Sequence, residues 1–258
     1  MTRTKIVKLK LERGTYDKLP DLRDGYPTFF LNVLRELQGL NMPMRTNSEA
    51  DIGACFEKAF EKSKGLDLNS ERLQRVYDSL KNHISDRPHS NHTSNIWAGL
   101  LLTALMQDSS HTDFTLSVNK RLDFMGFGLN GKRITMVGDV GDYPGSQMNG
   151  GSITVKGNAG DYVGFNMGRG EIQIEGNASD YAGSCMRGGY IHVKHVGDYA
   201  GHEMIDGVIT VSGDAGEHTG KRSKGGAIRV GGIIESASRD GMCKIEPLED
   251  PDDIGFDI

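Results

Sequence analysis

The sequence lacks a long apolar run and has few cysteines. Its longest apolar stretch, "IWAGLLLTALM" at 96–106, is too short to cross a bilayer, and "TRTKIVKLKLERG" after Met1 lacks the apolar core of a signal peptide. The three cysteines are far apart and show no CxxC spacing: Cys55, Cys185 and Cys243. This pattern fits thiols in a reducing compartment better than disulfides or a zinc site. We therefore expect a cytoplasmic protein without a membrane partner.

A strong charge of one sign is also missing. The 258 residues carry a net charge of −5, and basic residues occur in short clusters mixed with acids. A nucleic-acid interface would need a basic stripe, so we expect no nucleic-acid partner. With 36% hydrophobic residues the chain can bury a core, and its length allows two domains.

Glycine, by contrast, is abundant, with 35 residues concentrated in an internal repeat. "GDYPGSQMNGGSITVKG" from Gly141 returns as "GDYVGFNMGRGEIQIEG" from Gly160 and "SDYAGSCMRGGYIHVKH" from Ser179, and further copies begin at Gly197 and Gly216. A degraded copy precedes these, marked by Phe124, Gly126, Leu129, Lys132 and Ile134, with "FTLSV" at 114–118 as the strand before it. A repeat of this length indicates a solenoid.

Four kinds of residue recur at fixed places in the repeat. Glycine stands at Gly145, Gly164, Gly183, Gly201 and Gly220. Tyrosine stands two positions earlier in four copies, at Tyr143, Tyr162, Tyr181 and Tyr199. Methionine follows at Met148, Met167, Met186 and Met204, and isoleucine at Ile153, Ile172, Ile191, Ile209 and Ile228. We interpret all of them as structural: the glycines permit positive φ or close backbone approach at corners, and the other residues form ladders along the axis. Methionine in an irregular core is more usual than a methionine binding stripe.

The run after each glycine pair predicts a short strand. "SITV", "EIQI", "YIHV", "VITV" and "AIRV" alternate apolar and polar residues, so each strand has one apolar face. Strands stacked about 4.8 Å apart would join these faces into one core. We therefore predict a single-stranded β-helix of about six turns over 113–234, right-handed by analogy with parallel crossovers.

The first 112 residues differ from the repeat. "KIVKLKLE" alternates as one strand, and apolar residues then recur at helical spacing over 30–37, 52–60 and 73–84, with a fourth helix over 93–107. The predicted fold class is therefore α+β, with a helical domain over 1–112 that caps the N-terminal end of the solenoid. The acidic tail over 235–258 either covers the other end or remains mobile.

Few residues suggest chemistry. His89, His92, His111 and Asp113 form the only cluster that could serve an enzyme, with His83 nearby, but a solvated loop is favoured over a metal site. His192 and His195 lie on opposite faces of the predicted strand because their separation is odd; His192 takes an outward polar position, so surface decoration is favoured over chemistry.

A second set of polar residues repeats with the coil, at Asp142, Asp161, Asp180 and Asp198. Because an acid at every turn is more than catalysis or a single calcium site requires, we favour turn formation. No nucleotide-binding, esterase or zinc-protease motif occurs, so we expect no catalytic residue, cofactor or metal ligand.

The repeat itself supplies a resemblance. "GDYVGFNMGRGEIQIEGNASDYAGSCMRGGYIHV" resembles the GXGXG β-helix repeats found in one subunit of formylmethanofuran dehydrogenase, in the corresponding subunit of the bacterial formyltransferase/hydrolase complex, and in the C-terminal domain of the glutamate synthase large subunit. The resemblance covers 113–234 but not the helical part. It implies a right-handed β-helix without catalytic residues that packs beside catalytic domains in an oxidoreductase or formyl-transfer complex.

Three functions remain open on the sequence. The first is a non-catalytic assembly module with other protein subunits as partners. The second is an independent hydrolase-like enzyme with a site between the helices and the solenoid. The third is a scaffold that associates with itself as a homo-oligomer.

Overall fold

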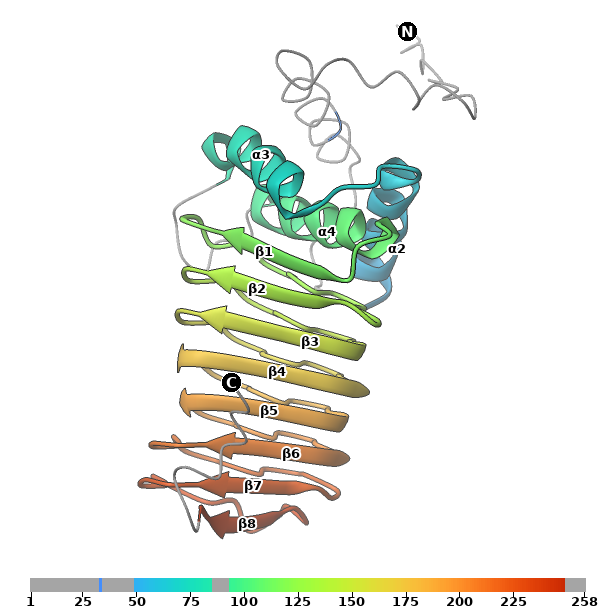
Figure 1. Ribbon diagram of the computed structural model, residues 1–258. Helices are drawn as coiled ribbons and strands as arrows, with labels where there is room; N and C mark the ends of the chain where they lie inside the picture. Colours follow the sequence, from blue (N-terminus) through green and yellow to red (C-terminus); the bar gives the residue numbers. More distant parts are fainter. Residues whose placement is uncertain (1–32, 34–48, 85–92, 249–258) are drawn as a thin grey trace, which may run out of the picture.

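The computed structural model describes Val33, residues 49–84 and residues 93–248. The expected N-terminal strand, most of the helix expected over 30–37, and His89 and His92 lie outside the described residues. Three helices stand at one end of a tall stack of strands (Figure 1). This arrangement confirms the predicted α+β fold with a β-helix.

The helices match the apolar spacing of the sequence. They are α2 (Glu49–Ser63), α3 (Ser70–Leu80) with a 3-10 turn at Lys81–His83, and α4 (Thr93–Asp108). Helix α3 begins after Asn69, whose side-chain oxygen accepts a hydrogen bond from the Arg72 backbone N–H. Helix α4 buries almost its whole length, from Ile96 to Met106, because it lies between the solenoid and the other two helices.

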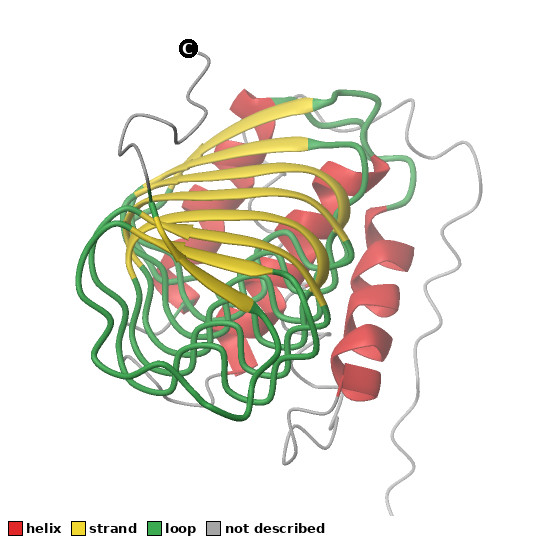
Figure 2. Ribbon diagram, turned by 90° about the horizontal axis from the view of Figure 1, so that it is seen from below, coloured by secondary structure: helices red, strands yellow, loops and turns green. Residues whose placement is uncertain are grey.

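The strands form one parallel sheet in which each strand pairs with the next in sequence. They are β1 (Asp113–Ser117), β2 (Arg133–Val137), β3 (Asn149–Lys156), β4 (Arg169–Asn177), β5 (Arg187–His195), β6 (Asp206–Val211), β7 (Ala227–Val230) and β8 (Lys244–Pro247). The strands run one way in the foreground of Figure 1 and the connections return behind them one level lower, which is a right-handed coil. Seen along the axis, strands make one side of each turn and loops make the rest (Figure 2).

The solenoid is longer than the sequence indicated. Strand β8 extends the sheet beyond residue 234, so the coil has about seven turns and the stretch over 235–247 belongs to it rather than to a separate tail. Of the four recurring rows, the last turn continues only the isoleucine row, with Ile245 in register with Ile228. The repeat was therefore not visible there, because its tyrosine, methionine and paired glycines are missing.

One hydrophobic core runs through the helices and the solenoid. The isoleucine row points inward and is fully buried, as Ile153, Ile172 and Ile191 show. The parts expected as two domains, 1–112 and 113–234, thus share a core in their described residues. Gly99 of α4 lies so close to the first coil that a Cβ there would be 1.9 Å from the Asp123 backbone oxygen.

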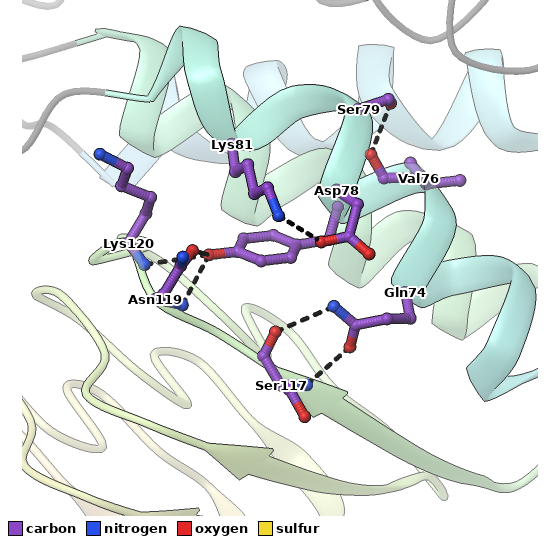
Figure 3. A network of polar contacts seen from close by, with 9 residues as sticks. Gln74, Val76, Asp78, Ser79, Lys81, Ser117, Asn119 and Lys120 are labelled. Carbon is purple, nitrogen blue, oxygen red and sulfur yellow. Dashed lines mark hydrogen bonds and ion pairs between the residues drawn. The ribbon is translucent and has the colours of Figure 1, made fainter.

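The helices also satisfy the open edge of the first coil. The Gln74 side chain donates to the Ser117 oxygen and accepts from the Ser117 N–H, at 3.0 and 2.7 Å (Figure 3). The Tyr77 hydroxyl accepts from the backbone N–H groups of Asn119 and Lys120 at 2.8 and 2.9 Å. Because an open strand edge invites pairing with another chain, these contacts cap the N-terminal end.

Candidate interaction surface

One corner of the coil carries a tyrosine in an unusual backbone conformation in four successive turns. Tyr143, Tyr162 and Tyr181 have φ of 61°, 60° and 61°, a left-handed region that non-glycine residues seldom occupy. The repeat glycine two positions later is left-handed as well: Gly145 has φ 69°, and a Cβ there would lie 2.3 Å from Ile172 Cδ1. Close approach and positive φ together explain the recurring glycine.

The tyrosine rings stack along the solenoid axis. We define the tyrosine stripe as Tyr143, Tyr162, Tyr181 and Tyr199. Adjacent ring centroids are 4.6 to 4.8 Å apart with interplanar angles of at most 10°. The rings are half-buried, and none of the four hydroxyls donates a hydrogen bond to a residue in the described part of the chain. The stripe therefore presents a row of phenol groups at the surface.

An aspartate precedes each ring of the stripe. We define the aspartate ladder as Asp123, Asp142, Asp161, Asp180 and Asp198. Each Oδ1 accepts a hydrogen bond from the backbone N–H of the acid one coil further on, at 2.8 to 3.2 Å. The preference for turn formation over catalysis or calcium binding agrees with these bonds. Within residues 49–84 and 93–248, no group of three His, Cys, Asp or Glu could hold a metal ion.

A second corner makes the same bond with different residues. We define the mixed corner as Asp139, Asn158, His195 and Asp214. Their side chains accept the backbone N–H one coil further on, at 2.7 to 2.9 Å. His195 uses Nδ1 as the acceptor, so it is part of the corner rather than surface decoration. The mixed corner was hard to find in the sequence because three residue types, Asp, Asn and His, accept the same backbone hydrogen bond.

The acids and the rings interact electrostatically. Burial, followed by the neighbouring Tyr162 and the nearby carboxylates, raises the pKa of Tyr143 to about 12. The pKa values of Tyr162 and Tyr181 are raised by the same causes. The phenols therefore remain protonated at neutral pH and can donate hydrogen bonds.

The methionine row does not reach the surface. Met148, Met167, Met186 and Met204 are fully buried. They pack with the isoleucines inside the coil. A methionine binding stripe is therefore excluded for these residues.

The residues nominated for enzyme chemistry do not converge where the structure describes them. Asp113 forms an ion pair with Arg133 and accepts from the Thr112 hydroxyl. His111 and His83 are exposed. His192 lies on the outer face of the sheet, in register with Gln173 and Thr210, but its side chain is only 19% exposed. Burial lowers the pKa of His192, and its Nε2 lies 3.7 Å from Glu171 Oε1.

Comparison with known proteins adds no relative. The chain matches no known protein family and no curated protein. None of the helices in the described ranges has both the length and the apolar character needed to cross a membrane. Cys55, Cys185 and Cys243 form no disulfide.

Proposed function

We propose that this chain is a non-catalytic assembly module whose solenoid holds other protein subunits in position. The proposal rests on one observation: the recurring polar side chains of the solenoid bond to its own backbone. Polar side chains recur at the two corners from coil to coil, acids at one corner and acids, an amide and an imidazole at the other, and they accept backbone hydrogen bonds from the next coil. An active site instead needs a few convergent groups of different kinds.

The resemblance of the repeat gives the proposed setting. We propose a cytoplasmic component of an oxidoreductase or formyl-transfer complex, similar to the β-helix subunit of formylmethanofuran dehydrogenase or the β-helix domain of glutamate synthase. The regular coil of the described residues suits this role because a stack of hydrogen-bonded turns presents a stiff, extended flank.

The ends of the solenoid favour a lateral partner over self-association. The helices satisfy the edge of β1, as described above. At the other end the backbone N–H groups of Lys244 and Leu248 donate to the Gly226 and Val230 carbonyls, so the backbone groups of Ile245 and Pro247 point toward the open edge of the sheet. Pro247 has no N–H, which leaves a poor template for another strand. Self-association through the strand ends is therefore less favoured. The enzyme alternative is also less favoured, because His111 and Asp113 do not converge with other catalytic groups in the described residues.

Native purification of the tagged protein from its own cells, followed by mass spectrometry, tests this function. We expect stoichiometric recovery of other subunits, including one with a catalytic domain. Recovery of the chain alone as a defined homo-oligomer would contradict the assembly function. If the isolated chain shows turnover, His111→Ala tests the enzyme hypothesis. Unchanged turnover would exclude His111 as a catalytic residue, whereas lost turnover would favour an enzyme over an assembly module.

A further inference from the structure

We propose that residues 249–258, which we define as the acidic segment, cover the C-terminal end of the solenoid core. The inference does not depend on the proposed assembly function. It assigns an occupant to the end of the coil that lies opposite the helices (Figure 1). The acidic segment lies outside the described residues, and the surface that it would cover lies within them.

The last coil leaves the end of the hydrophobic core uncovered. In the coil before it, Ile228 and Ala215 are buried. Their partners in the last coil, Ile245 and Ile234, are only half-buried, because β8 is the last strand of the sheet and no further coil packs against it in the described chain. At the opposite end Phe114 of β1 is buried under the helices. The core therefore has a cover at one end and lacks one at the other.

Exposed side chains extend this surface. Ile233 and Met242 of the last coil are 72% and 77% exposed, the highest values among the large hydrophobic residues of the described chain. Cys243 beside Met242 is half-buried. We define the apolar end as Ile233, Ile234, Met242, Cys243 and Ile245. Apolar surface of this kind, when polar residues surround it, marks a site of contact.

The acidic segment carries side chains that suit the apolar end. Ile254, Phe256 and Ile258 stand at alternate positions, so an extended backbone places all three on one face. Gly255 and Asp257 between them then lie on the other face. The segment can therefore bury three large apolar side chains against the apolar end while Asp257 stays in water.

Charge favours the same contact. The acidic segment has no Lys or Arg and carries acids at Glu249, Asp250, Asp252, Asp253 and Asp257. On the last two coils Lys224, Arg239 and Lys244 are exposed, and none of them forms an ion pair with another described residue. The neighbouring Arg222 and Arg229, by contrast, are paired within the coil. Three cations near the apolar end are therefore available to the acids of the segment.

The acidic segment is also long enough to cover this surface. It starts after Leu248, whose backbone N–H donates to the Val230 carbonyl, so it leaves the solenoid at the last coil. An extended chain advances about 3.3 Å per residue, so residues 249–258 can reach about 33 Å. A coil of nineteen residues at the same rise is about 20 Å wide. The segment can therefore cross the whole apolar end.

The alkylation rate of Cys243 in the full chain tests the proposal. Iodoacetamide is the probe, and mass spectrometry of the peptides follows each cysteine separately. Cys185 is half-buried several coils away and serves as the internal reference. The variant Ile254→Ser, Phe256→Ser, Ile258→Ser should raise the rate at Cys243 about tenfold, because losing the burial of one such side chain amounts to about one power of ten. The rate at Cys185 should not change.

Gly255→Ser is the matched control. It changes the acidic segment but keeps its acids and its apolar side chains, so Cys243 should react at the wild-type rate. Equal rates at Cys243 in the wild type and the triple variant would overturn the proposal. Protection of Cys243 that rises with protein concentration would also overturn it, because a second copy would then cover the end. Protection that appears only when other subunits copurify would assign the end to a partner instead.

Discussion

At the scale of single residues, the hydrogen-bonding role of a carboxylate in the aspartate ladder can be tested separately from its negative charge. Asp161 accepts the Asp180 N–H, and the Asp161 N–H donates to Asp142 in turn. We expect Asp161→Asn to match or exceed the wild type in free energy of unfolding, because it keeps the acceptor and removes repulsion from two neighbours. Asp161→Ala should lose about 1 kcal/mol, since the Asp180 N–H then lacks its partner. Urea unfolding of both variants measures this. Equal losses in the two would show that the charge itself stabilises the turn.

The tyrosine stripe predicts a pH dependence in the alkaline range. The pKa of Tyr143 is raised to about 12 in the folded chain, so the folded state holds its proton more tightly than the unfolded state does. Stability from this group is complete below about pH 10 and is lost as the pH rises toward about 12. Absorbance titration of tyrosinate should show a late-titrating group that disappears in Tyr143→Phe. A titration unchanged by that substitution would contradict the assignment.

Residue patterns made part of these sites predictable. The glycine, tyrosine, methionine and isoleucine rows repeat one residue type, so their ladders could be found in the sequence. The mixed corner could not, since Asp139, Asn158 and His195 differ in type while their backbone task is the same. The left-handed conformation of the tyrosines was also missed, because bulky residues usually avoid positive φ.

At the scale of elements, two helical glycines predict opposite effects of one substitution. Gly53 in α2 has no atom within 4 Å of an added Cβ, so Gly53→Ala should stabilise the protein by about 0.5–1 kcal/mol through helix propensity. At Gly99 in α4 the same Cβ would meet the Asp123 oxygen. Gly99→Ala should therefore destabilise by about 1–3 kcal/mol, because the helix must move off the first coil. Thermal unfolding compares the two, and a similar sign for both would contradict the close packing of α4.

The contact between α3 and the first coil predicts the effect of losing one hydroxyl. Tyr77→Phe leaves the backbone N–H groups of Asn119 and Lys120 without the acceptor described above. We expect a loss of about 1–3 kcal/mol in the free energy of unfolding. Tyr190→Phe is the matched control, since Tyr190 is 55% exposed, and it should change little. If the two variants lose equal stability, the hydroxyl of Tyr77 does not hold the cap.

The sequence predicted which helices form more accurately than it predicted where the solenoid ends. The apolar spacing indicated α2 and α3 because each has a face that must be buried, whereas α4 is apolar and buried along almost its whole length. Strand β8 escaped prediction because a lone isoleucine and a proline do not make an alternating run. The pairing with β7, which only the folded chain brings about, defines β8.

At the scale of the whole molecule, the two ends of the solenoid differ. The N-terminal end is covered by helices that bond to its edge groups. The last coil leaves Ile233 and Met242 at 72% and 77% exposed, and its strand edge ends in Pro247. Within residues 49–84 and 93–248 neither end offers a good edge for strand addition, which is why our proposal places the partner on the long flanks of the coil.

The mass of the chain in fresh extract of its own cells tests the central claim most directly. Sedimentation of a fluorescently tagged chain at its natural abundance gives this mass without purification. The assembly account predicts one species much heavier than the 28.2 kDa chain with its tag, and the purified chain alone should not form this species. A species that has the mass of the single chain, or a fixed multiple of it that the purified chain reproduces alone, would contradict the account.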